Sequence, residues 1–245
     1  MSIKFENTEV MGWEAAIRGM RNPMNSWEKS DSGYCMDTLA CHTCKENRNS
    51  CKKNIDNHKF IIGPNDLDLM KRLRNAGTDH RKFMRMITVY VDITAPLYWW
   101  KEFDTYKVGT VANSCSTMHK IASKEFTLDD FSCEHLTKGS IEHLDDTINT
   151  LNDCRYWYMR YDAMDKKDRI HFDEAITCKK DMWWQMIQLL PNSYNQKRTV
   201  MMNYEVLANI YKSRKNHKLD EWSVGFMNWI NELPYSELIT GIENE

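Results

Sequence analysis

Four cysteines within a short polar stretch carry the sharpest chemical signal in the sequence. They follow the pattern C-x5-C-x2-C-x6-C at Cys35, Cys41, Cys44 and Cys51. The two-residue gap allows two thiolates in a tight turn to reach one tetrahedral zinc ion, and the flanking cysteines complete the ligand set. His42 is a possible substitute ligand. We expect a structural zinc site, since four thiolates leave no open coordination position; the alternative is four free thiols in an insertion.

A second group of reactive side chains lies in residues 94–121. Its hydroxyl, amide and cationic groups could hold a phosphate and a base together: Asn113, Ser114, Ser116, Thr117, His119, Lys107 and Lys120. The aromatic run Tyr98 to Trp100 could stack on a flat ring, or it could belong to a buried helix whose tryptophans are core. We favour the core position for the aromatic residues and leave the polar cluster open between a binding site and small packing residues.

The charge balance excludes several classes of partner. With 33 basic against 35 acidic residues and no long run of one sign, the chain does not resemble proteins that bind nucleic acids non-specifically or hold anionic membranes. The first residues, MSIKFENTEV, contain no apolar core of a signal peptide, and no window reaches about 18 apolar residues. We expect a cytoplasmic protein whose eight cysteines are thiols or metal ligands.

The elements that must position these side chains are mostly helices. Alternating apolar residues from Phe83 to Ile93 predict one strand that ends at Pro96. Asn65 is the expected N-cap and Gly77 the stop signal of one helix. Helical spacing of apolar residues predicts helices over residues 10–20, 65–76, 145–161, 181–190, 201–211 and 219–233. The sequence predicts one domain over residues 1–245 with a Cys-rich insert at residues 28–58.

The segment from Tyr106 to His119 (YKVGTVANSCSTMH) fits part of a known signature. It resembles the sequence RHRxxSxNExSxRY of flavin-dependent thymidylate synthases and keeps the asparagine as Asn113 and the later serine as Ser116. The Arg-His-Arg triplet is replaced by Tyr106-Lys107-Val108. Because charge-assisted hydrogen bonds contribute about 1.5–3 kcal/mol each, this loss predicts weak flavin binding.

Two further elements in the same order are similar to that family. Upstream, its Gly, Glu-His pair and Phe before a strand resemble Gly77, Asp79-His80 and Phe83. Downstream, its Leu-Pro, Asn, Arg and His-containing turn resemble Leu190-Pro191, Asn203, Arg214 and His217, while an arginine just after the asparagine is replaced by Glu205. The likeness covers about half the chain, residues 60–121 and 185–233. Divergent relatives encoded by phages and prophages are also similar.

The resemblance implies an α+β fold that is flavin-dependent thymidylate synthase-like, helix-rich and built on a small antiparallel sheet. It implies methylation of C5 of deoxyuridylate with methylene-tetrahydrofolate and FAD. Four residues would bind the pyrimidine nucleotide: Asn113, Ser114, Ser116 and Arg214. Three residues would lie near the flavin: His80, Lys107 and His217. It also implies a homotetramer with sites built from several subunits, for which we expect residues 98–100 and 222–229 to offer apolar surface.

Three alternatives stay open. If flavin chemistry is lost, Cys115 could add as a thiolate to C6 of a pyrimidine, with Lys107 or His119 lowering its pKa, although a buried, inert cysteine is the favoured interpretation. The chain could instead be a non-catalytic protein that binds or sequesters a nucleotide. The third interpretation is a zinc-stabilised structural module with no nucleotide site.

Overall fold

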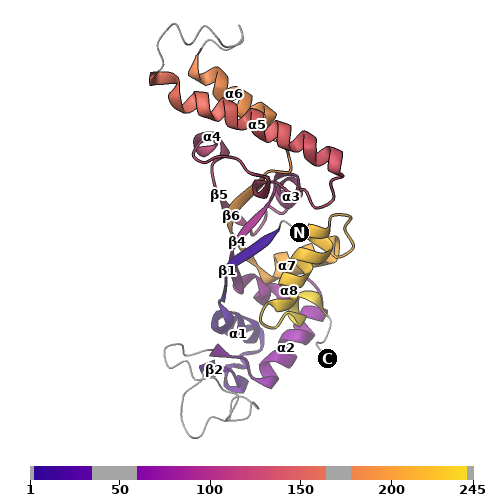
Figure 1. Cartoon of the computed structure of the whole chain (residues 1–245). Helices are drawn as coiled ribbons and strands as arrows, with labels where there is room; N and C mark the ends of the chain where they lie inside the picture. Colours follow the sequence, from indigo (N-terminus) through magenta and orange to yellow (C-terminus); the bar gives the residue numbers. More distant parts are fainter. Residues whose placement is uncertain (1–2, 35–59, 164–177, 242–245) are drawn as a thin grey trace, which may run out of the picture. The chain divides into compact units, whose positions relative to one another are not determined.

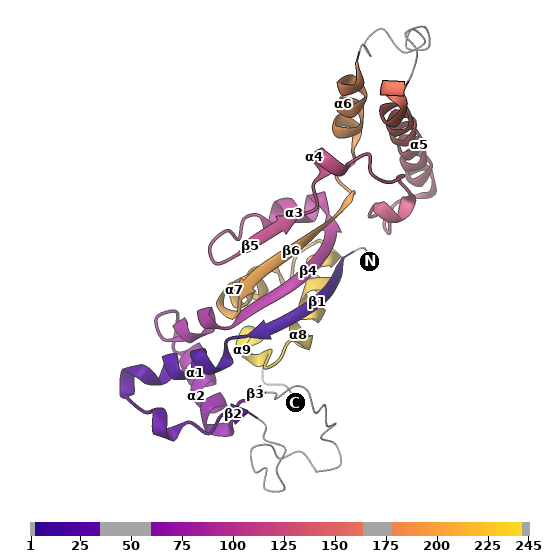
Figure 2. The same ribbon diagram turned by 90° about the vertical axis from the view of Figure 1, so that its left-hand side faces the viewer.

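The structure of the chain is a computed structural model that describes residues 3–34, 60–163 and 178–241 (Figure 1). Four strands form one sheet in the order β1 (Lys4–Met11), β4 (Thr88–Pro96), β6 (Asn195–Asn203) and β5 (Val111–Ser114). Adjacent strands run in opposite directions, so the sheet is antiparallel (Figure 2). A second, two-stranded antiparallel sheet pairs β2 (Gly33–Tyr34) with β3 (Phe60–Ile61).

Strand β4 confirms the alternation found in the sequence. Val89, Val91, Ile93 and Ala95 are buried, and β4 ends at Pro96 as predicted. Strands β1 and β6 were not predicted. β1 (KFENTEVM) is mostly exposed and β6 (NQKRTVMMN) is largely polar, so neither carries the apolar alternation that marks a half-buried strand.

The chain divides into two compact units. Unit 1 comprises Met1–Glu6, Asp92–Thr105 and Ala112–Thr199, and unit 2 comprises Asn7–Val91, Tyr106–Val111 and Val200–Glu245. Four of the boundaries fall within β1, β4, β5 and β6, and the fifth lies between Thr105 and Tyr106, before β5. The organisation as a single domain over residues 1–245 therefore stays a prediction.

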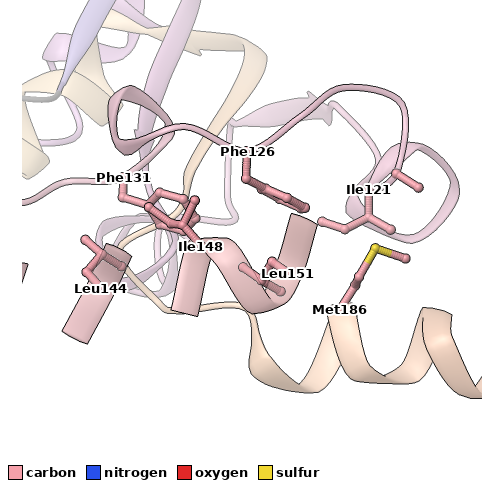
Figure 3. Packing of buried hydrophobic residues seen from close by; sticks show 8 residues of the cluster. Ile121, Phe126, Phe131, Leu144, Ile148, Leu151 and Met186 are labelled. Carbon is pink, nitrogen blue, oxygen red and sulfur yellow. The ribbon is translucent and has the colours of Figure 1, made fainter. Parts of the chain in front are cut away.

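Unit 1 contains a helical hairpin with its own core. It holds α3 (Leu97–Phe103), α4 (Thr117–Lys120), α5 (Lys138–Arg160) and α6 (Lys179–Leu189). Helix α5 presents one apolar face toward α6 and the preceding loop (Figure 3). The buried residues of this cluster are Ile121, Ala122, Phe126, Phe131, Leu144, Ile148, Leu151 and Met186. The spacing of Leu144, Ile148 and Leu151 is the helical one that the sequence predicts for this segment.

Unit 2 packs the remaining helices. They are α1 (Trp13–Arg21), α2 (Pro64–Asn75), α7 (Tyr204–Arg214), α8 (Met227–Glu232) and α9 (Glu237–Thr240), with a π-helical turn at Glu221–Phe226 before α8. Each predicted helical segment contains a helix, but residues 10–11 belong to β1 and residues 201–203 belong to β6. The expected N-cap Asn65 is wrong, because α2 begins one residue before it. Gly63 is its N-cap, and the Asp31 carboxylate accepts hydrogen bonds from the backbone N–H groups of Asn65 and Asp66 at 2.8 and 3.0 Å. A side chain distant in sequence caps this helix, which local spacing cannot reveal.

A buried carboxylate ties the start of α2 to the end of α1. Asp66 accepts from Arg21 Nε at 2.6 Å and from the hydroxyls of Ser30 and Ser32 at 2.7 and 2.6 Å. Burial alone raises the pKa of Asp66, but these hydrogen bonds outweigh it and hold the pKa below its usual value. This ion pair therefore stabilises unit 2 above the ordinary pKa of an aspartate.

The tryptophans that were expected to offer apolar surface are buried within the chain. Trp99, Trp100 and Trp222 are at most 1% exposed and Trp229 is 5% exposed. Their core positions confirm the preferred interpretation of the run at residues 98–100. The expectation of apolar surface for other subunits is wrong for these tryptophans, because their rings pack against Phe103 and Phe226 in the same chain, whereas Val224 is 41% exposed. The homotetramer itself stays a prediction.

Two other predictions meet the limits of the described residues. Cys35, Cys41, Cys44 and Cys51 lie outside them, so the zinc site stays a prediction. Among the residues that are described, no group of three or more His, Cys, Asp or Glu side chains could hold a metal ion. In the same residues no helix has the length and apolar character needed to cross a membrane.

Candidate functional site

The segment Asn113–Ser116 lies at the end of an edge strand and the start of a short helix, in unit 1. Asn113 and Ser114 belong to β5, all four residues of which are exposed. Ser116 is the N-cap of α4, and its hydroxyl accepts from the backbone N–H of His119 at 3.0 Å. The Asn113 and Ser114 side chains are therefore accessible to a ligand, and the Ser116 hydroxyl can still donate one hydrogen bond.

Cys115 is exposed, so the favoured interpretation as a buried, inert cysteine is wrong about its burial. The backbone N–H of Cys115 donates to Lys197 O at 2.9 Å, which ties the residue to β6. The thiol is accessible to a ligand, and its role as a nucleophile stays a prediction.

Arg214 lies in an aromatic cluster of unit 2. Its Nε donates to the hydroxyl of Tyr106 at 2.8 Å. The guanidinium carbon lies 5.5 Å from the centre of the Tyr106 ring and 5.2 Å from the centre of the Trp222 ring. The two rings are themselves 6.3 Å apart in an edge-to-face arrangement. Aromatic faces attract a guanidinium and restrict its rotation, so Arg214 is held in one orientation.

His217 lies beside the same cluster. Its ring centre is 6.5 Å from that of Trp222, and its Nδ1 accepts from the backbone N–H of Leu219 at 3.2 Å. The structure therefore groups His217 and Arg214 around Trp222. The sequence resemblance assigns His217 to the flavin and Arg214 to the nucleotide.

The other predicted flavin residues are at the surface of unit 2. His80 and Lys107 are both exposed, and Val108 is 90% exposed. The turn after them depends on Gly109, whose φ of +78° favours glycine. A Cβ on Gly109 would lie 3.0 Å from the side chains of Asn203 and Val206 at the start of α7. This close approach fixes the path of the chain beside Lys107.

Glu205 forms a charge cluster with Arg81 and Arg85. The side chain is only 9% exposed and accepts from Arg81 Nε at 3.3 Å and from Arg85 Nε. Arg81 Nη2 also donates to Asn209 at 3.0 Å. Burial raises the pKa of Glu205, but the hydrogen bonds and charges of Arg85 and Arg81 outweigh it and lower the pKa overall. A negative charge at this position is thus compensated within the protein.

Sequence reasoning missed three residues of these clusters. Tyr106 was treated only as a lost arginine, yet its hydroxyl orients Arg214. Arg81 and Arg85 were not singled out. Glu205 could have indicated them, because a buried carboxylate needs a basic partner. Arg198, a further cation of unit 1, is paired with Asp104 at 2.8 Å.

The comparisons with known proteins can be set beside this geometry. No known protein-family model matches the sequence, and no curated protein sequence matches it. The fold is similar to the crystal structure of the flavin-dependent thymidylate synthase ThyX from Helicobacter pylori complexed with FAD and dUMP. The TM-score is 0.59 at 14% sequence identity, and the match covers 98% of this chain and 97% of that chain. A second structure, Thymidylate Synthase X from the same organism with FAD and dUMP, has a TM-score of 0.55 at 13% identity and covers 97% and 95% of the two chains.

The chain therefore has a ThyX-like fold, helix-rich with a small antiparallel sheet. The fold class implied by the sequence resemblance is confirmed over nearly the whole length, including parts of the chain where no signature residue was found.

Proposed function

We propose that this chain binds deoxyuridylate or a closely related pyrimidine nucleotide and methylates C5 of its base, in the manner of flavin-dependent thymidylate synthases. The observation that carries the proposal is the fold, which matches a protein solved with FAD and dUMP along almost the entire length of both chains. The low identity leaves the choice of ligand to the chain's own side chains, and two groups of them suit a nucleotide.

The first group centres on Arg214, which we assign to the phosphate. A guanidinium offers five N–H donors in a planar fork that suits phosphate oxygens. Tyr106 and Trp222 already hold it in one orientation, so little side-chain entropy is lost when an anion binds. Charge-assisted hydrogen bonds of this kind contribute about 1.5–3 kcal/mol.

The second group is Asn113, Ser114 and Ser116, which we assign to the base. A uracil edge presents both donors and acceptors, and an amide with two hydroxyls can match both. The exposed position of β5 leaves the first two side chains accessible. The proposal does not require the two groups to meet within one chain, since the resemblance implies a homotetramer whose sites combine several subunits.

The residues at the triplet position do not fit FAD in the way that the resemblance implies. The hydroxyl of Tyr106 accepts from Arg214, and Val108 is an exposed apolar side chain, so only Lys107 supplies a positive charge there. The carboxylate of Glu205 replaces a further arginine of the family. We therefore expect FAD to bind weakly or not at all.

This disagreement favours a second candidate function, a non-catalytic protein that binds or sequesters the nucleotide. Calorimetry with deoxyuridylate and the absorbance of the purified protein separate the candidates. Nucleotide binding with bound flavin and formation of thymidylate supports the enzyme. Nucleotide binding without flavin supports the second candidate. A Kd of about 1 mM corresponds to a binding free energy of about 4 kcal/mol. If no pyrimidine nucleotide binds even at that concentration, both candidate functions are wrong.

Zinc at Cys35, Cys41, Cys44 and Cys51 remains part of the proposal as a structural ion. Metal analysis of protein purified without added zinc should give about one equivalent per chain. If the protein contains no zinc and all four thiols react freely, this part of the proposal is wrong. Methylene-tetrahydrofolate likewise remains the proposed carbon donor for the enzymatic candidate alone.

A further inference from the structure

Gln196 is a buried side chain of β6 whose carboxamide makes two directed hydrogen bonds within unit 1. The residue is 7% exposed. Its Nε2 donates to the backbone carbonyl of Cys115 at 2.8 Å, and its Oε1 accepts from Arg198 Nε at 3.0 Å. Because a carbonyl can only accept and a guanidinium can only donate, these two partners fix which way the amide faces.

Arg198 is itself held in place by α3 and the residue after it. Its guanidinium carbon lies 4.2 Å from the centre of the Trp100 ring, and its Nη1 donates to Asp104 at 2.8 Å. Trp100 is 1% exposed, and its Nε1 donates to the backbone carbonyl of Gln196 at 2.9 Å. The orientation of the Gln196 amide therefore rests on a rigid part of unit 1.

The segment that receives this amide has little packing of its own. Asn113, Ser114 and Cys115 are exposed, so buried side chains do not hold them in register. Besides the pairing of β5 with β6, two contacts at Cys115 hold this turn: its N–H donates to Lys197 O, and its carbonyl accepts from the Gln196 side chain. Removing the second contact would leave the Cys115 carbonyl oxygen without this donor and loosen the turn.

We propose that Gln196 is a positioning residue for the nucleotide, which holds the backbone between Ser114 and Ser116 in its binding geometry, and that Arg198 sets the direction of its amide. This inference rests on the proposed function, since it assigns a purpose to the segment that contacts the base. A segment fixed in advance loses less entropy on binding, so the effect is expected in affinity as well as in stability.

The test uses Gln196→Glu, which keeps the shape of the side chain. A carboxylate still accepts from Arg198 but cannot donate to the Cys115 carbonyl. The expected result is a rise of about tenfold or more in the Kd for deoxyuridylate, measured by calorimetry. Without nucleotide, hydrogen exchange of peptides covering residues 111–120 should also become faster, because the turn opens more often.

Asn152 offers a matched control in the same unit. Its amide holds another stretch of backbone in the same manner, donating to Phe126 O at 2.9 Å and accepting from Phe126 N at 2.8 Å. Asn152→Asp makes the same amide-to-acid change away from residues 113–116. We expect it to lower stability but to leave the Kd and the exchange of residues 111–120 unchanged.

A second variant guards against poor folding of Gln196→Glu. Arg198→Met removes the donor that orients the amide, so Gln196 Oε1 and Asp104, whose side chain is 51% exposed, both lose this partner. It should raise the Kd in the same direction by a smaller factor. If the wild type binds the nucleotide and neither variant changes the Kd, or if hydrogen exchange in residues 111–120 stays unchanged, only the positioning role is overturned. A wild-type chain that binds no pyrimidine nucleotide overturns the proposed function and this role together.

Discussion

At the first turn of α7 a buried carboxylate meets two arginines, whereas at the last turn an arginine meets a neutral hydroxyl and two aromatic rings. Glu205 is paired with Arg81 and Arg85 from the 3-10 helix Arg81–Met86. Arg214 donates to Tyr106 and lies near the rings of Tyr106 and Trp222. Both residues belong to unit 2 and to one helix of eleven residues.

The difference indicates what each end contributes. An ion pair whose charges compensate each other within the chain contributes to the stability of the fold. Breaking it leaves a partly buried charge without its partner. A guanidinium held by a hydroxyl and two aromatic faces has its direction set before a ligand binds. We infer that the first end of α7 serves stability and that the last end serves recognition of an anion.

The largest expected effect is on stability, from Glu205→Ala. It removes the carboxylate that both arginines share, and we expect a loss of about 3 kcal/mol in the free energy of unfolding. Denaturant unfolding measures it. Glu14→Ala is the control, because the Glu14–Arg18 pair is well exposed and should contribute less than about 0.5 kcal/mol. Equal losses in the two variants would remove the distinction between the ends of α7.

The pH dependence of stability tests whether the charge of Glu205 is what stabilises the first turn of α7. The pKa of Glu205 in the folded chain lies below the ordinary value of 4.5, so its charge stabilises the fold above pH 4.5 and this contribution is lost as the pH falls through the lowered pKa. Glu205→Gln should therefore be less stable than the wild type at pH 7, and the gap should narrow below pH 4.5. A gap that stays constant with pH would mean that shape, not charge, is what Glu205 contributes.

At the last end, Arg214→Ala should act mainly on binding. We expect affinity for deoxyuridylate to fall by about 2 kcal/mol, roughly thirtyfold, while the free energy of unfolding changes less. Arg214→Lys should restore only part of it, since lysine lacks both the planar fork and the bond from Nε to Tyr106. Lys212→Ala, at an exposed position on the same helix, should leave the Kd unchanged. If Lys212→Ala weakens binding as much as Arg214→Ala does, the loss of affinity comes from the general positive charge of the helix and not from a specific contact.

The smallest effect should come from Tyr106→Phe. The ring stays near Trp222 and Arg214, but the hydroxyl that accepts from Arg214 Nε is lost. We expect a loss of about 1 kcal/mol in nucleotide affinity, measured by calorimetry, from a less well oriented guanidinium. The control is Tyr90→Phe, at an exposed position in β4. Unchanged affinity in Tyr106→Phe would show that the rings alone orient Arg214.

The sequence predicted the helices and the central strand because their patterns are local. Leu144, Ile148 and Leu151 repeat at helical spacing, and Val89, Val91 and Ile93 alternate, so each pattern identifies its element without its neighbours. Strand β6 escaped prediction because its residues pair with both β4 and β5, and the pairing does not require an apolar side chain at every second position.

The sites were harder to predict because their contacts join distant residues. Asn113 and Arg214 could be found by their place in a signature, but the partners that orient such groups have no fixed spacing. Tyr106 lies 108 positions from Arg214, and Arg85 lies 120 positions from Glu205. The exposure of Cys115 was also mispredicted, since its neighbours in sequence do not reveal that β5, which ends just before it, lies at an edge of the sheet.

The short ladder between β2 and β3 has an evolutionary consequence. Gly33 pairs with Ile61 and Tyr34 with Phe60, so the positions on either side of residues 35–59 are held next to each other. A change in the number of codons between these positions therefore need not separate β2 from β3. The four clustered cysteines are encoded within that stretch, so selection can alter them independently of Asn113 and Arg214.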